Sequence, residues 1–168
     1  MQDALLTYGE LGLGSRLKRL SDLMMREIHV VYDTCNIEFD PYLFPVFNII
    51  IEHQQVTTTT IQEALQYTQP AITQAIKKLS SKKLISHKVD KQDKRKKLFQ
   101  LTKKGIALHH ELIPLWQIID QQVKWLTEGS ANSLTSHLNF FENQLQKKSL
   151  SNRILEEYSK LKKQNENN

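Results

Sequence analysis

The run from Val89 to Gly105, VDKQDKRKKLFQLTKKG, constrains the fold of this chain more than any other segment. β-Branched and aromatic residues around it predict two short paired strands, Ile85 to Val89 and Leu98 to Leu101. The loop between them alternates acidic and basic side chains, and a helix start follows at once. A hairpin with such a cationic loop has a shape that fits a groove of DNA.

The net charge of +5 conceals a strong asymmetry along the chain. Residues 77–104 hold twelve Lys or Arg and two Asp, whereas the rest of the chain holds eleven bases and sixteen acids. A positive cluster on an otherwise acidic chain indicates contact with a polyanion at one place. Charge alone would also fit a solvated, lysine-rich surface. The secondary structure predicted around the basic cluster is therefore needed to choose between these two interpretations.

Length and composition bound the class of protein. The 168 residues suit one domain with an appended helical arm, and 39% hydrophobic residues support a core. No apolar stretch is long enough to span a membrane, and the start lacks the early Lys or Arg of a signal peptide. Cys35 is the only cysteine, which fits a reducing cytoplasm. We expect it to pack as a small buried hydrophobe and not to serve as a redox thiol.

Two helices are expected before residue 55. Ser15 is predicted to cap the first, which ends near Thr34. The second, Leu43 to His53, is apolar nearly all round and has Pro45 in its first turn, so it should be central to the core. The one-sided apolar stripe of the first helix is Leu17, Leu20, Met24, Ile28, Val31 and Cys35.

The C-terminal third is also predicted to be helical. Thr102 should cap a long helix that Pro114 bends and that Gly129 ends. The apolar face of this helix is expected to hold Leu108, Leu112, Leu115, Ile119, Val123 and Leu126. Two more helices and a disordered tail are expected at 134–145, 150–161 and 162–168.

Two short helices joined by a tight turn precede the hairpin. A capping box at Thr59 or Thr60 should start the first, its register being open by one residue, and the helix should run through Tyr67. Thr68 can cap the second, with Pro70 in its first turn. The inward positions are expected to be Ile61, Ala64 and Leu65 in the first helix and Ile72, Ile76 and Leu79 in the second.

This layout is typical of a helix–turn–helix, whose second helix enters the major groove and contacts base edges near its N-terminus. Gln can pair with adenine, Thr can donate or accept a hydrogen bond, and Ala or a Thr methyl can contact the thymine methyl. The alternative is a surface helix that Thr68 and Thr73 merely cap and decorate. The residues expected to face DNA are Thr68, Gln69, Ala71, Thr73, Gln74, Lys77 and Lys78.

Through TIQEALQYTQPAITQAIKKLSSKKLI and DKQDKRKKLFQLTKKG, the chain resembles the MarR family of bacterial winged-helix regulators. The family's Asp-x-Arg element is present as Asp93-Lys94-Arg95, and its Leu-Thr-x-x-Gly junction runs from Leu101 to Gly105. The likeness covers about residues 15–147. It implies a mostly α fold with a small β-hairpin wing, in which a winged helix–turn–helix lobe sits on a helical dimerisation base.

Within a single domain over residues 1–168, the resemblance places the winged lobe at 42–102 and the dimerisation base at 15–35 and 103–161. The resemblance also assigns roles to two residues of the wing. Arg95 would enter a minor groove, and Asp93 would hold Arg95 in place by a charge-assisted hydrogen bond. Phosphate contacts, which add affinity without sequence information, would come from Lys94, Lys96 and Lys97, and Lys91 is also expected to contact DNA.

The same resemblance implies a homodimer and a cavity for a small-molecule effector, which Tyr32, Phe44 and Trp116 would line. Aromatic side chains of this kind also pack in cores. His109 and His110 are adjacent, so on a helix they cannot share a metal ion as residues four apart can. We therefore expect no metal, no cofactor and no enzymatic activity.

The leading hypothesis is a cytoplasmic, sequence-specific transcriptional regulator that binds double-stranded DNA as a dimer on a near-palindromic operator. The start SRLKRLSD resembles a subgroup that is sometimes joined to an acetyltransferase domain. A module that controls a separately encoded acetyltransferase is therefore the first alternative. The basic cluster by itself would also fit a non-specific nucleic-acid binder.

Overall fold

A computed structural model describes residues 3–91, 93–127 and 134–166. The chain divides into two compact units, Met1–His110 and Glu111–Asn168. None of the described helices is long and apolar enough to cross a membrane.

Unit 1 begins with helical turns that lead directly into its longest helix. These are α1 (Ala4–Thr7), the 3₁₀ turn η1 (Gly9–Gly12) and α2 (Leu13–Thr34). The prediction that Ser15 caps this helix is wrong, because Gly12 already has helical dihedrals and no break precedes Leu13. An ion pair of 2.7 Å between Asp3 and Arg19 ties α1 to α2.

The end of α2 is set by a residue in a left-handed conformation, Asn36, with φ of 56°. The N–H of Ile37 donates to the carbonyl of Tyr32 at 2.9 Å, and that of Asn36 donates to Asp33 at 3.1 Å. This is a Schellman motif, which turns Ile37 into the core. Cys35 lies on the outer side of that turn, so the prediction of a buried cysteine is wrong: it is exposed.

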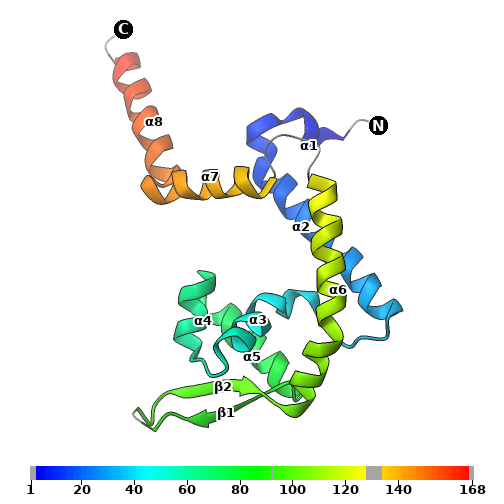
Figure 1. Ribbon diagram of the computed structural model, residues 1–168. Helices are drawn as coiled ribbons and strands as arrows, with labels where there is room; N and C mark the ends of the chain where they lie inside the picture. The colour runs from blue at the N-terminus through cyan, green and yellow to red at the C-terminus, as the bar shows by residue number, and fades with distance from the viewer. Residues whose placement is uncertain (1–2, 92, 128–133, 167–168) are drawn as a thin grey trace. The chain divides into compact units, whose positions relative to one another are not determined.

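The remaining elements of unit 1 form a lobe with a single core. Figure 1 shows α3, α4 and α5 gathered beside the hairpin of β1 and β2. Their bounds, with the 3₁₀ turn η2 that precedes them, are η2 Pro41–Leu43, α3 Phe44–His53, α4 Thr58–Leu65, α5 Gln69–Ser81, β1 Ile85–Val89 and β2 Lys97–Leu101. The predicted helix at 43–53 is confirmed, with Pro45 in its first turn. Side chains from every one of these elements are buried, among them Leu43, Phe47, Ile50, Ile61, Ile72, Leu79, Ile85 and Phe99.

Helix α4 starts earlier and ends earlier than predicted. Its N-cap is Thr57, whose side chain accepts a hydrogen bond from the N–H of Thr60 at 3.1 Å, so neither expected capping box forms. The helix ends at Leu65 because Gln66 adopts a left-handed conformation. Ile61 is fully buried as expected, but Ala64 is exposed.

The hairpin is antiparallel, with Ile85 opposite Leu101 and Val89 opposite Lys97. The second strand thus begins one residue before the predicted Leu98. Val56, just before α4, exchanges two backbone hydrogen bonds with Phe99, of 3.0 and 2.8 Å. Strand β2 is therefore held on both sides, by β1 and by the segment that leads into α4.

The long helix α6 (Lys103–Thr127) begins in unit 1, and unit 2 continues with α7 (Leu134–Lys147) and α8 (Leu150–Glu166). Helix α6 continues through Pro114. The predicted helix end at Gly129 lies outside the described residues. Leu126, expected on the apolar face of α6, is exposed.

The C-terminal helix is longer than the sequence suggests. It continues to Glu166, so the prediction of disorder from residue 162 is wrong over 162–166. Helix-favouring Lys, Gln and Glu fill this segment, and an ion pair of 2.6 Å joins Lys160 to Glu157 one turn away.

Candidate nucleic-acid interface

Helix α5 has two distinct faces. One is buried in the lobe and consists of Ile72, Ala75, Ile76 and Leu79, which confirms the predicted apolar stripe. The other is open to solvent, and it carries every residue that the sequence predicts to face DNA from this helix. These are Thr68, Gln69, Ala71, Thr73, Gln74, Lys77 and Lys78.

The start of α5 has the predicted residues but not the predicted hydrogen bond. Thr68 occupies the N-cap position, yet its side chain accepts no capping hydrogen bond. Pro70 lies in the first turn and has no N–H to donate, which removes one of the donors that an N-cap side chain normally takes. The hydroxyl of Thr73 donates to the carbonyl of Gln69 at 2.9 Å, so its oxygen remains able to accept.

The end of α5 repeats the geometry seen at the end of α2. Lys83 is left-handed with φ of 58°, and the N–H of Leu84 donates to the carbonyl of Leu79 at 3.0 Å. Leu84 is thereby buried, and the chain is directed into β1. This turn sets the position of the hairpin relative to α5.

The Leu-Thr-x-x-Gly junction fixes the other end of the hairpin. Thr102 caps α6 as predicted, because its hydroxyl oxygen accepts from the N–H of Gly105 at 3.0 Å. The same hydroxyl donates to the carbonyl of Lys83 at 2.7 Å. A Cβ on Gly105 would lie 2.1 Å from the carbonyl oxygen of Leu84, so only glycine fits at this contact. The turn after α5 and the start of α6 are thus joined at one point.

The loop of the hairpin is organised by its two aspartates. The N–H of Arg95 donates to Oδ1 of Asp93 at 3.1 Å, and the Nε of Arg95 lies 3.5 Å from the same oxygen. Lys96 reaches the second oxygen of Asp93 at 3.9 Å, while Asp90 accepts from the N–H of Asp93 at 3.4 Å. The contact expected between Asp93 and Arg95 is present, and it acts mainly on the backbone of Arg95.

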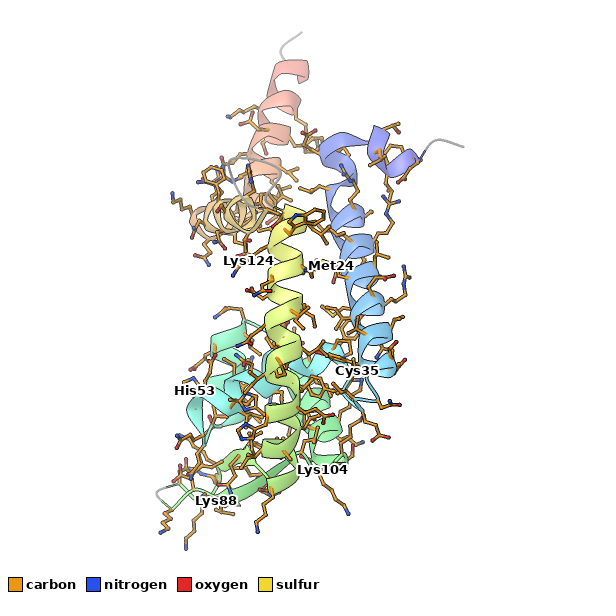
Figure 2. The ribbon with its side chains drawn as sticks, turned by 45° about the vertical axis from the view of Figure 1, so that its right-hand side comes forward. Met24, Cys35, His53, Lys88, Lys104 and Lys124 are labelled. Carbon is orange, nitrogen blue, oxygen red and sulfur yellow. The ribbon has the colours of Figure 1, made fainter. Side chains whose placement is uncertain are left out.

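The cationic side chains of this loop extend into solvent. The side chain of Arg95 is 95% exposed, and the predicted DNA contacts Lys91, Lys94, Lys96 and Lys97 are exposed as well. Figure 2 shows Lys88, on β1, at the same end of unit 1. Lys88 is exposed but was not assigned a role from the sequence, although the basic cluster at 77–104 includes it.

Lys78 differs from its neighbour Lys77. Its ammonium lies 3.0 Å from the carboxylate of Asp40, which precedes η2, whereas Lys77 makes no ion pair among the described residues. Lys82, one turn further along α5, donates to the carbonyl of Glu38 at 3.3 Å. Because these partners lie about forty residues apart in the chain, no sequence pattern could have revealed them.

Of the residues expected to line an effector cavity, Tyr32 and Phe44 belong to unit 1 and Trp116 belongs to unit 2. Tyr32 is 1% exposed and packs edge-on against Phe39, with ring centroids 6.0 Å apart, as a core residue does. Phe44 is 40% exposed, and Trp116 belongs to unit 2.

The histidines offer no metal site in the described part of the chain, which contains no group of three or more side chains placed to bind one. The rings of His109 and His110 stack at 5.9 Å. Burial lowers the pKa of His109, and the proximity of His110 lowers it further.

Two comparisons place this geometry among known proteins. Residues 45–105, from α3 to the first turn of α6, match the family model of a winged helix DNA-binding domain. Residues 45–105 therefore have the fold of a winged helix domain. This domain includes α5, the hairpin and the Thr102–Gly105 junction, so all of the predicted DNA contacts lie inside the match. No curated protein matches the chain in sequence.

The winged helix domain also lies within a larger shared fold. The Escherichia coli MarR C80S mutant in complex with operator DNA is 20% identical with a TM-score of 0.64, over 79% of this chain and 93% of that one. The PcaV regulator of Streptomyces coelicolor, in complex with its natural ligand, is 20% identical with a TM-score of 0.60, over 90% and 99%. The Sulfolobus solfataricus regulator BldR is 19% identical with a TM-score of 0.60, over 88% and 99%. The chain therefore has the fold of these regulators, as the resemblance implies.

Proposed function

We propose that this protein is a sequence-specific DNA-binding transcriptional regulator. The observation that carries the proposal is a single lobe that presents an uncharged polar helix start and a cationic loop to solvent together. Gln69 and Gln74 of α5 contact base edges in the major groove, and Arg95 enters the flanking minor groove. The exposed wing lysines bind phosphates and add affinity for any sequence.

The active form is a homodimer, formed by the segments 15–35 and 103–161. Apolar side chains on these helices remain exposed in a single chain, which favours a partner of the same kind. Large exposed examples are Leu20, Leu23, Val30, Ile118, Trp125, Phe140, Ile154 and Tyr158. Two-fold symmetry then places two half-sites about one helical turn apart, which makes the operator nearly palindromic.

The regulator works in the cytoplasm, without catalysis of its own, and responds to a small molecule. The MarR and PcaV structures, with operator DNA and with a natural ligand, support this view by shared fold. The alternative role as a module that controls a separate acetyltransferase receives no support from these matches.

Selection of bound duplexes from a random DNA pool tests the proposal. We expect an enriched, nearly palindromic motif for the full chain. The Gln74→Ala variant should relax base preference at one position in each half-site, whereas Gln146→Ala, on the exposed surface of α7, should return the parent motif. If no motif is enriched, the protein binds DNA without sequence preference, and the proposal is refuted.

A further inference from the structure

Four exposed lysines of the basic cluster at 77–104 have no part in the DNA contacts proposed above. Lys83 follows α5, Lys88 lies on β1, and Lys103 and Lys104 are the first two residues of α6. None of these four side chains makes an ion pair with a described residue. Their charges are therefore open to a partner from outside the chain.

Three of these lysines are held together at the base of the hairpin. The hydroxyl of Thr102 donates to the carbonyl of Lys83 at 2.7 Å, so the residue after α5 adjoins the residue before Lys103. The N–H of Thr102 donates to the carbonyl of Leu84 at 3.0 Å and strengthens the same connection. These bonds fix the backbones of Lys83, Lys103 and Lys104 beside one another. We call these three residues the junction patch.

Each lysine of the junction patch occupies a position that local structure disfavours. Lys83 has a left-handed conformation, with φ of 58°, which is less favourable for a residue with a side chain than for glycine. Lys103 and Lys104 lie in the first turn of α6, where the positive end of the helix dipole repels cations and favours acidic side chains. Because the stability of the fold would gain from other residues at these positions, the patch indicates a function outside folding.

The positive charge continues along the hairpin from its loop to its base. Figure 2 shows Lys88 and Lys104 at the same end of unit 1. Strand β1 runs from the base to the loop in four steps of about 3.3 Å, or about 13 Å in all. Neither β1 nor β2 contains an acidic residue, so no carboxylate on the strands interrupts the row of cations. A long polyanion fits such a row better than a compact acidic group on a protein does.

We infer that the junction patch is a second phosphate-binding site for operator DNA, separate from the wing loop. Lys83, Lys103 and Lys104 bind backbone phosphates of the duplex whose minor groove Arg95 enters. The phosphates supply the negative charge that both the three ammonium groups and the start of α6 favour. The contact adds affinity without sequence information, because every sequence has the same phosphates. This inference rests on the proposed function, since it assigns the patch to the same DNA.

Titration of a selected duplex at several salt concentrations tests the patch directly. The double variant Lys103→Gln/Lys104→Gln should reduce the slope of log affinity against log salt by about two, because each lost phosphate contact removes about 0.9. Its affinity near 0.15 M salt should fall at least about tenfold. The double variant Lys124→Gln/Lys147→Gln removes the same charge from exposed lysines of α6 and α7 and should keep the parent slope. Lys103→Arg/Lys104→Arg keeps the charge and should keep the slope as well.

Thermal unfolding separates a DNA contact from a structural role. Because the helix end repels Lys103 and Lys104, their double Gln variant should unfold at or above the temperature of the parent. Lys83→Gly relieves the left-handed conformation and removes a charge, so it should also keep or raise the unfolding temperature while it weakens DNA binding. Variants that lose stability together with DNA affinity would indicate a structural role and overturn the inference.

Selection from a random DNA pool distinguishes the two proposals. The Lys103→Gln/Lys104→Gln variant should return the parent motif, and a different motif would assign these lysines to bases and overturn the phosphate role. If the parent itself selects no motif, the proposed function fails, whereas the salt slopes on any duplex still test the patch. A parent that selects its motif, with equal salt slopes for the parent, the patch variant and the Lys124/Lys147 control, would overturn the patch alone.

Discussion

Unit 1 and unit 2 use their apolar side chains in different ways. Of the seventeen buried apolar residues in the described chain, sixteen belong to unit 1, and Leu112 is the single member from unit 2. Unit 2 instead leaves large apolar side chains exposed at Ile118, Trp125, Leu126, Leu134, Phe140, Phe141, Leu150, Ile154, Leu155 and Tyr158. In unit 1, most of the comparable exposed side chains fall within residues 1–35.

The contrast separates a part of the molecule that completes its own core from a part that needs another surface. The winged helix lobe can hold α5 and the wing rigidly because its helices and strands bury one another. The exposed apolar side chains of unit 2 and of α2 would be stabilised by a second surface that covers them. The proposed DNA contacts and the proposed pairing of chains therefore fall on different segments.

The largest expected effect is a loss in the free energy of unfolding, and it should differ between a core phenylalanine and an exposed one. Phe47 is fully buried, so Phe47→Ala should lower the free energy of unfolding by about 3–5 kcal/mol in urea titrations. Phe140 is 66% exposed, and Phe140→Ala should change that free energy by less than about 1 kcal/mol. Equal losses of unfolding free energy in both variants would contradict the proposed difference in core packing between the two units.

A pair of glycines within unit 1 sharpens the same comparison. Gly105→Ala forces a Cβ against the carbonyl of Leu84 and should destabilise the lobe by about 3 kcal/mol, measured by thermal or urea unfolding. In Gly14→Ala, on α2, the added Cβ meets nothing within 4 Å, and we expect a gain of about 0.4–1 kcal/mol. A neutral Gly105→Ala would mean that the junction does not hold the wing.

The wing arginine should matter for DNA and not for folding. Arg95→Ala is expected to weaken binding to the selected duplex by about 1–3 kcal/mol in a titration at fixed salt, because it loses a minor-groove contact. Its unfolding midpoint should stay at the parent value, since the side chain is almost fully exposed. Arg16→Ala serves as the control. Unchanged DNA affinity would remove Arg95 from the interface.

The smallest effect is expected at a single wing lysine. Lys96→Ala should weaken binding to all duplexes alike and reduce the slope of log affinity against log salt by about one. Lys124→Ala, on α6 in unit 2, should leave the slope unchanged. A loss confined to one operator sequence would contradict a phosphate contact.

The elements that sequence predicted well are those with a strong period. Helix α5 agrees with the pattern because one buried face alternates with one exposed face. Strand β1 has the predicted bounds, although Ile85 is its only buried residue. The sequence could not choose a cap among the four threonines at 57–60, since each offers the same hydroxyl. It also missed the left-handed turns at Asn36 and Lys83, where no glycine marks the end of the helix.

The candidate site divides in the same way. The outward residues of α5 follow from local spacing, and the Asp93–Arg95 contact follows from the family resemblance of Asp93-Lys94-Arg95, so both could be predicted. The pairing of Lys78 with Asp40 depends on segments distant in sequence, which local patterns do not bring together. Cys35 shows that a residue at the end of an apolar stripe can be turned outward by a single left-handed residue after it.

The central claim is that the winged lobe binds DNA while α2 and unit 2 pair two chains. The most direct test measures the mass of the protein–DNA complex on a selected palindrome and on one half-site. We expect two chains on the full palindrome, with affinity at least about a hundredfold higher than on the half-site, because pairing makes the second contact intramolecular. One chain per duplex, with equal affinity for the palindrome and the half-site, would contradict the assignment of α2 and unit 2 to pairing.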